Sequence, residues 1–323
     1  MIRFNLRAVL MLAAALLLSA CASKPMPPAK SVEPVKTALW VGNSFFYYNN
    51  SMHGHVGSLI AAADPGTKGY RATSVTISGS GINWHDLESH FKPGGVGSYS
   101  FDAGNNVVFN SFAKPFDVVI MMDCSQCPIH PQLSKFFTEY AAKNSAIARS
   151  HGAEPVFFMS WAYADKPEMT EQLAAAYVKA GADNRAKVVP AGLAFAKSIA
   201  KRPELNLYVA DKRHPSLAGT YLAACTAFAS VYGQSPVGNR YDYYGRIDKD
   251  TAAFLQQVAA DWLQPAALQR CVSTDGPLGG EWFNIPTVAA LDAQVWGQGF
   301  EAPVFCDEVE VLQQRLVGEK HLK

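Results

Sequence analysis

The chain has 323 residues, of which 49% are hydrophobic and 17% are charged, and this composition excludes a disordered or fibrous protein. The formal net charge of +1 provides no excess of positive charge for a nucleic-acid surface, so we expect no DNA or RNA partner. No apolar run reaches the roughly 20 residues that a membrane-spanning helix needs. The length suits one large domain with additions, or two small domains.

The N-terminus has the pattern of an export signal. Arg3 and Arg7 precede an apolar stretch over residues 8–18, and small residues then lead to Cys21. The run Leu-Ser-Ala-Cys that ends there resembles the bacterial lipobox, which implies removal of residues 1–20 and a lipid on the Cys21 thiol. The alternative is an ordinary signal peptide in which the cysteine is accidental.

The segment after the signal predicts a membrane tether. Residues 21–36 contain four prolines among Lys and Ser, a composition typical of an extended linker. A lipid on Cys21 would hold the protein at a membrane without spanning it. The residue directly after Cys21 is Ala22, and not an Asp. By resemblance to lipoproteins of double-membraned bacteria, this implies a bacterial envelope location, at the outer membrane and facing the periplasm.

Strand-like and helix-like segments then alternate along the chain. Short buried-type runs predict strands over residues 37–41, 70–77, 117–122, 155–161 and 205–209. Helical periodicity predicts helices over residues 51–63, 131–151, 170–182, 191–201, 216–232 and 250–263. The segment 93–112, rich in Gly, Asn and Ser, predicts an insertion loop or a hairpin. This alternation predicts an α/β fold with a central parallel sheet covered by helices on both faces.

The same pattern divides the mature chain into two parts. We expect the main domain over residues 37–235 and a C-terminal extension over residues 236–323, which either caps that domain or forms part of a cleft. Cys271 and Cys306 both lie in the extension and are candidates for a disulfide there. Cys225 lies in an Ala-rich helical pattern and predicts a buried free thiol.

Another cysteine pair leaves alternatives open. Cys124-x-x-Cys127 follows a predicted strand. We expect the two cysteines either to form a disulfide or to stay reduced, and in both cases to shape the loop. A thioredoxin-like redox motif is the alternative.

Ser44 is the first candidate for chemistry. It follows the first predicted strand, at the edge of a parallel sheet where ligands bind, and Gly42 allows close approach of the backbone. The structural alternative is a turn in which Ser44 caps the next helix.

Asp211-x-x-His214 supplies the partners that a nucleophilic serine needs. A carboxylate three residues before a histidine can accept from one ring nitrogen and fix the tautomer. The other ring nitrogen is then free to take a proton from a serine hydroxyl. Because residues 205–209 predict a strand before it, we expect His214 at the same sheet edge as Ser44. The alternative is a surface turn.

Gly42-Asn43-Ser44 near the mature N-terminus, together with Asp211-x-x-His214 far downstream, resembles the SGNH (GDSL-type) hydrolases. The resemblance covers roughly residues 37–233 and implies a flavodoxin-like three-layer α/β/α sandwich. It also implies ester hydrolysis by a catalytic triad of Ser44, Asp211 and His214, with no cofactor and no metal. The usual first block is Gly-Asp-Ser, and here Asn43 replaces the Asp.

The resemblance also assigns an oxyanion hole. Its second block matches Gly79, with Gly81 as the neighbouring choice. Its third block is normally Gly-x-Asn-Asp, and the Asn position falls on Gln126, whose amide can also donate. The donors would then be the Ser44 N–H, the Gly79 N–H and the Gln126 side chain.

The substrate implied is a small-acyl ester, such as an acetyl ester, of a small molecule or an envelope polysaccharide, with lipid esters and thioesters as the alternatives. The competing interpretation is a non-catalytic envelope lipoprotein that binds a glycan or a lipid.

Other polar and aromatic side chains are weaker candidates. His53-x-His55 could hold a metal, but without a third ligand we expect both histidines on a helix surface. His85 is a candidate for lining the cleft. The aromatic run over residues 45–48 predicts mostly core side chains, with one or two near the substrate.

Overall fold

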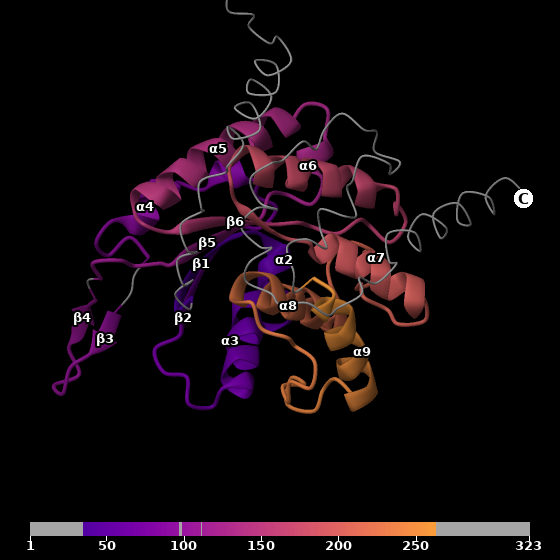
Figure 1. Cartoon of the computed structure of the whole chain (residues 1–323). Helices are drawn as coiled ribbons and strands as arrows, with labels where there is room; N and C mark the ends of the chain where they lie inside the picture. Colours follow the sequence, from indigo (N-terminus) through magenta and orange to yellow (C-terminus); the bar gives the residue numbers. More distant parts are fainter. Residues whose placement is uncertain (1–34, 97–98, 111, 263–323) are drawn as a thin grey trace, which may run out of the picture.

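The computed structural model describes residues 35–96, 99–110 and 112–262 (Figure 1). The predicted signal, the lipidation site Cys21, the tether up to residue 34, Cys271 and Cys306 lie outside the described residues. Within the described ranges, no helix is long and apolar enough to cross a membrane.

A five-stranded sheet forms the centre of the molecule. Its strands are β1 (Thr37–Gly42), β2 (Arg71–Thr76), β5 (Val118–Met121), β6 (Glu154–Phe158) and β7 (Lys187–Val189). All neighbouring pairs are parallel, in the order β2-β1-β5-β6-β7. Counted within this sheet alone, that is the flavodoxin-like order 2-1-3-4-5. The predicted α/β sandwich with a central parallel sheet is therefore confirmed.

Helices cover both faces of the sheet, as a parallel sheet of apolar strands requires. On one face lie α5 (Ser134–Ser150) and α6 (Met169–Asp183), and on the other lie α3 (Met52–Ala63) and α8 (Leu217–Tyr232) (Figure 1). Helix α7 (Ala191–Lys201) packs beside α8, and α9 (Lys249–Ala260) packs against both. Side chains of the central strands, such as Trp40 and Ile120, are fully buried between these layers.

One predicted strand is wrong. Residues 205–209 do not join the sheet and make a single antiparallel bridge, between Tyr208 and Pro215. The segment instead folds back on the loop after it, because the N–H of Val209 donates to the carbonyl of His214. The fifth strand is β7, whose three residues are too few to show a pattern in the sequence.

Within the segment 93–112, residues 99–109 form the hairpin that was one of its two predicted structures. Strand β3 (Tyr99–Phe101) pairs with β4 (Val107–Phe109) in antiparallel register. The hairpin projects from the body of the molecule (Figure 1), and its aromatic side chains are largely exposed.

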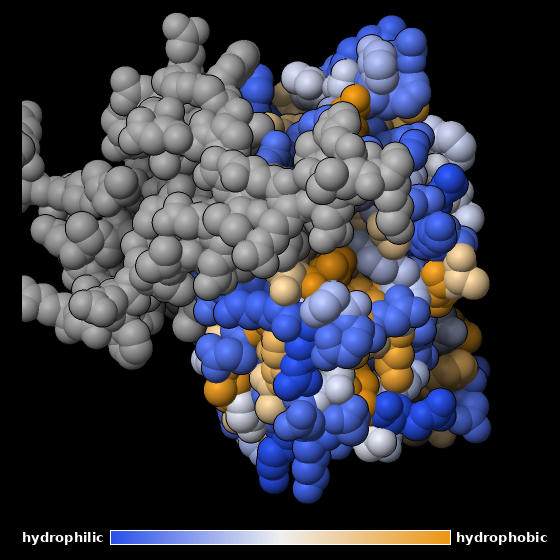
Figure 2. Space-filling model, turned by 90° about the vertical axis from the view of Figure 1, so that its right-hand side faces the viewer, coloured by the Kyte–Doolittle hydropathy of each residue, from blue (hydrophilic) through white to orange (hydrophobic). Residues whose placement is uncertain are grey.

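The described part of the C-terminal extension packs onto α3 and α8. The Asn239 amide donates to the carbonyl of Leu59 in α3 over 2.9 Å, and the Gln256 amide of α9 donates to the Tyr221 hydroxyl of α8 over 2.8 Å. Cys225 of α8 is a buried free thiol, as predicted. The outer face nearby mixes hydrophobic and hydrophilic side chains where described residues are visible (Figure 2).

Candidate active site

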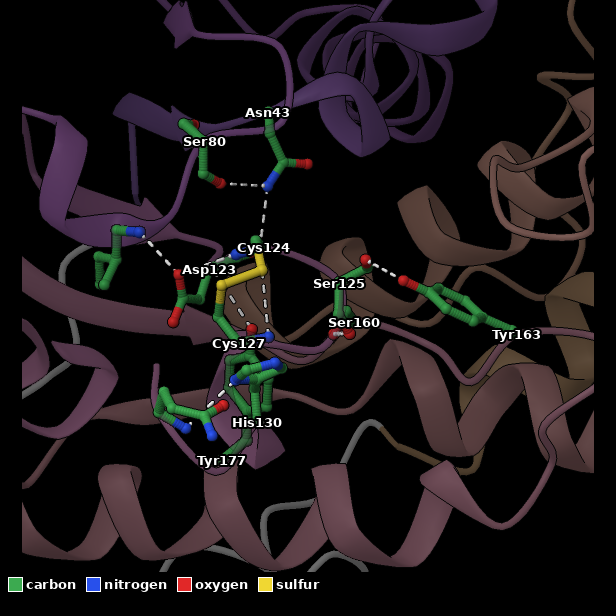
Figure 3. Close-up of a disulfide and its surroundings, with 12 residues drawn as sticks. Asn43, Ser80, Asp123, Cys124, Ser125, Cys127, His130, Ser160, Tyr163 and Tyr177 are labelled. Carbon is green, nitrogen blue, oxygen red and sulfur yellow. Dashed lines mark hydrogen bonds between the residues drawn. A yellow bond between two sulfur atoms is a disulfide. The ribbon is translucent and has the colours of Figure 1, made fainter. Parts of the chain in front are cut away.

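Three loops meet at the carboxyl edge of the sheet, where Asn43 joins them. Its amide nitrogen donates to the carbonyl of Ser80, after β2, over 3.1 Å and to the carbonyl of Asp123, after β5, over 3.0 Å (Figure 3). Its side-chain oxygen accepts from the N–H of Phe45 and so caps α2 (Ser44–Tyr47). Asn43 therefore fixes the start of the helix that carries Ser44.

Ser44 is the first residue of this short helix. Gly42 directly before Asn43 has no room for a side chain, because an added Cβ would lie 2.8 Å from the ring of Phe46. Ser44 is largely buried, and its Oγ lies 2.8 Å from Nε2 of His214, a residue 170 positions away in the sequence. The structure thus brings the predicted nucleophile and base into hydrogen-bond contact.

Asp211 completes the arrangement. Its Oδ2 lies 2.5 Å from Nδ1 of His214, and its Oδ1 accepts from the N–H groups of Arg213 and His214. Because a carboxylate only accepts, Nδ1 of His214 carries the proton and Nε2 is left to accept from Ser44. Desolvation raises the pKa of Asp211, but the hydrogen bonds from His214 and Arg213 outweigh it and hold this pKa at about 2.

Aromatic side chains fix the plane of the His214 ring. Tyr48 stacks on it with ring centres 4.3 Å apart, and Phe45 meets it edge-on at 5.3 Å. Phe45 in turn stacks on Trp161, whose indole N–H donates to the carbonyl of Arg213 over 2.9 Å. In the aromatic run after the serine, Phe46 is therefore core and two residues support the histidine, whereas Tyr47 is exposed.

Gly79 lies in the loop after β2, beside α2. The residues on either side of it hold this loop in place, because Tyr47 donates to the Ser78 hydroxyl and Asn43 donates to the Ser80 carbonyl. Gly79 has a φ of 70°, and an added Cβ would meet nothing within 4 Å. At Gly81, the alternative, an added Cβ would meet the side chains of Asn83 and Asp123 at 2.6 and 3.0 Å.

Gln126 lies in the loop closed by a disulfide between Cys124 and Cys127 (Figure 3). Of the structures predicted for this pair, the disulfide is the one found. The Ser125 hydroxyl lies 2.7 Å from that of Tyr163, so the loop is held from the β6 side. Among the described residues, no hydrogen bond joins the Gln126 amide to Ser44. Gln126 thus lies in the loop after β5, at the sheet edge where Ser44 lies, and its part in an oxyanion hole stays a prediction.

Sequence reasoning missed Asp123, which follows β5 directly. The side chain is almost fully buried, and its Oδ1 accepts from the N–H of Ile82 over 2.7 Å and of Cys124 over 2.8 Å (Figure 3). Burial raises its pKa to about 6, against the weaker lowering effect of these two bonds. Its position at the end of a buried strand was the signal available in the sequence.

The expectation of surface histidines on α3 is wrong for His55. Its ring is almost fully buried, with Nε2 2.7 Å from the carbonyl oxygen of Asn49 and Nδ1 3.1 Å from the hydroxyl of Tyr241. The C-terminal extension covers it, which no local pattern reveals. His85 is also buried, with Nε2 3.0 Å from the Ser80 hydroxyl, and desolvation lowers its pKa to about 4.

No protein-family model matches the chain. Among solved structures, the chain is similar to a DUF4886 family protein from Bacteroides uniformis, with 16% identity, a TM-score of 0.48 and coverage of 70% of this chain and 93% of that one. It is also similar to TesA, with 20% identity, a TM-score of 0.43 and coverage of 60% and 97%. A candidate SGNH hydrolase from Slackia heliotrinireducens is 23% identical, with a TM-score of 0.43 and coverage of 60% and 98%.

The family in the last of these names is the one that the sequence resembles. The fold class of this chain is established by its own strand order. The argument for a catalytic site is based on the contacts of Ser44, His214 and Asp211.

The curated relatives match over short stretches. The chain is 46% identical over 68 residues to the single-stranded-DNA-specific exonuclease RecJ of Salmonella typhimurium, which is 21% of this chain and 12% of that protein. It is 40% identical over 82 residues to RecJ of Escherichia coli, 24% of this chain and 14% of that protein. The chain thus spans about an eighth of the length of these relatives. Because Ser44 and His214 are 170 residues apart, neither match can include both.

Proposed function

We propose that the protein is a serine esterase of the SGNH type, with Ser44, His214 and Asp211 as its catalytic triad. The observation that carries this proposal is the 2.8 Å contact between Ser44 Oγ and His214 Nε2, in a ring whose other nitrogen is bonded to Asp211. A histidine held in this way gives a serine hydroxyl the general base that it needs to act as a nucleophile.

The reaction proceeds through an acyl-enzyme. Ser44 Oγ attacks the ester carbonyl carbon while its proton moves to Nε2 of His214. The tetrahedral intermediate then collapses, the bond to the alcohol oxygen breaks, and the leaving oxygen takes the proton from Nε2. Water then attacks the acyl group while the same nitrogen takes its proton. The bond to Ser44 Oγ breaks, Oγ takes that proton from Nε2, and the carboxylic acid leaves. Asp211 stabilises the imidazolium in both halves, as does the face of the Tyr48 ring stacked on it.

The oxyanion would be bound by the N–H groups of Ser44 and Gly79, with the Gln126 amide as a third donor. The position of Gly79 in a loop held beside α2 supports its part in this proposal. The Gln126 amide would donate to the oxyanion itself and needs no bond to Ser44 in the free protein. Loss of one such donor typically lowers the rate by about 10²–10³.

The triad is tested by hydrolysis of p-nitrophenyl acetate and by labelling with a fluorophosphonate. Ser44→Ala and His214→Ala should each abolish hydrolysis, and mass spectrometry should find the phosphonyl adduct on the peptide that contains Ser44. Ser230→Ala, on the far part of α8, is a matched control that should hydrolyse at the wild-type rate. Hydrolysis that survives both triad substitutions would defeat the proposal. A folded wild-type protein with neither hydrolysis nor labelling would favour the alternative, a non-catalytic lipoprotein that binds a glycan or a lipid.

We propose further that the substrates are small-acyl esters of envelope carbohydrate and that a lipid on Cys21 holds the enzyme at the outer membrane, facing the periplasm. The signal pattern before Cys21 supports the location, and the disulfide between Cys124 and Cys127 is compatible with an oxidising compartment. Metabolic labelling with a palmitate analogue should mark the full chain and should be lost in Cys21→Ser. Labelling that persists in this variant would contradict the assignment.

A further inference from the structure

The segment between the nucleophile helix and α3 has an unusual backbone. Asn49, Asn50 and Ser51 all have positive φ, at 52°, 70° and 69°. Residues other than glycine rarely adopt this conformation, and a run of three persists where surrounding contacts hold it. The segment begins directly after Tyr48, the residue that stacks on His214.

The side chain of Asn49 contacts the loop that carries the base. Its amide nitrogen donates to the carbonyl of Pro215 over 2.9 Å and to the hydroxyl oxygen of Thr220 over 2.8 Å. Because a carbonyl only accepts, the side-chain atom that faces Pro215 is the nitrogen, and both of its hydrogens are used. Pro215 directly follows His214, so Asn49 fixes the chain next to the catalytic ring.

The backbone of Asn49 is held from the opposite side. Its carbonyl oxygen lies 2.7 Å from Nε2 of the buried His55, and this nitrogen must therefore carry the ring proton. Nδ1 of His55 then accepts from the Tyr241 hydroxyl over 3.1 Å. Tyr241 belongs to the C-terminal extension. A continuous chain of hydrogen bonds thus runs from the extension through His55 and Asn49 to the residue beside His214.

We propose that Asn49 is a positioning residue of the esterase, which holds the His214 loop in register with the Ser44 helix, and that His55 and Tyr241 hold Asn49 in place. This inference rests on the proposed function. Displacing Asn49 would loosen the support of His214 at two points at once, the carbonyl of Pro215 and the stacked ring of Tyr48. Misplacement of a reacting group by about 1 Å can lower a rate about 100-fold.

Asn49→Gly tests the proposal, because glycine accepts the left-handed backbone and lacks the amide. Asn50→Gly is the matched control, at an exposed neighbour with the same kind of backbone. We expect kcat for p-nitrophenyl acetate to fall about 10- to 100-fold in Asn49→Gly with little change in KM, and the rate of fluorophosphonate labelling to fall by a similar factor. The midpoint of thermal unfolding should lie only slightly below that of the control, because the two bonds that are lost are partly buried. Equal kcat in the two variants would overturn the proposal.

Thr220→Val and Tyr241→Phe keep the test decisive if Asn49→Gly does not fold. The first variant removes an acceptor for the Asn49 amide, and the second removes the hydroxyl that holds His55. Each should lower kcat several-fold without raising KM, and wild-type kcat in both would overturn the proposal. A wild-type protein that is not labelled at Ser44 defeats the esterase itself. A labelled, active wild type with unaffected variants defeats only the role of Asn49.

Discussion

The two sides of the candidate triad are built differently. Ser44 follows a central strand, and the almost fully buried Asn43 ties its helix to the loops after β2 and β5. The base lies in the irregular loop over residues 202–216, where the side chain of Asp211 is 43% exposed. The sheet positions the nucleophile, whereas the base depends on side chains that reach its loop from elsewhere.

Three successive carbonyls show how the base loop is held. The carbonyl of Arg213 accepts from the Trp161 indole, that of His214 from the backbone of Val209, and that of Pro215 from the Asn49 amide. Changes on the base side should therefore lower the rate while leaving the fold intact, whereas changes on the nucleophile side should lower the stability of the whole domain. Three predictions test this difference.

Asp211→Asn should have the largest effect on rate. The amide no longer stabilises the imidazolium and permits the wrong ring tautomer, so we expect kcat to fall about 10²–10⁴-fold. The free energy of unfolding should change by less than about 1 kcal/mol, because the carboxylate is partly exposed and its bonds are screened by solvent. Asp165→Asn, at an exposed carboxylate 3.8 Å from Lys212, is the matched control. A large loss of stability in Asp211→Asn would contradict the expectation that changes on the base side leave the fold intact.

Asn43→Asp should lower stability, although Asp is the residue that the SGNH first block usually has. The carboxylate can still accept from the N–H of Phe45, but it cannot donate to the carbonyls of Ser80 and Asp123. Two buried carbonyls lose their donor, and we expect a loss of about 2–4 kcal/mol in urea unfolding at pH 8. Asn105→Asp in the exposed hairpin turn should change stability little. Equal stability of the two variants would show that the Asn43 bonds do not hold the nucleophile loop.

Asp123 should give the nucleophile side a distinctive pH dependence. Burial raises its pKa from 3.8 to about 6, so the native state binds a proton that the unfolded state has lost between these values. Stability therefore falls as pH rises through about 4 to 6, by about 2–3 kcal/mol from this group. Asp123→Asn removes this pH-dependent loss of stability. The free energy of unfolding of the variant, minus that of the wild type, should therefore rise by about 2–3 kcal/mol between pH 4 and pH 7. A difference that does not vary with pH would show that Asp123 is not desolvated.

Local sequence pattern predicted much of the framework. The alternation of apolar runs and helical periods predicted four of the five sheet strands, and the spacing of Asp211 and His214 predicted their contact, because residues three apart in a tight turn meet without help from the rest of the fold. His214 was placed at the correct edge for an incorrect reason, since residues 205–209 form no strand of the sheet. The short strand β7 was missed, because three residues carry no period.

The sequence by itself determined the fold class, the serine after the first strand and the aspartate–histidine pair, because each depends on a local pattern of a few residues. Only the tertiary structure decided that Ser44 and His214 meet across 170 residues, that Asp123 is buried, and that His55 is covered by the C-terminal extension. These features arise from packing between distant segments, whose free energy depends on all of their neighbours at once and is not written in any single stretch of the chain.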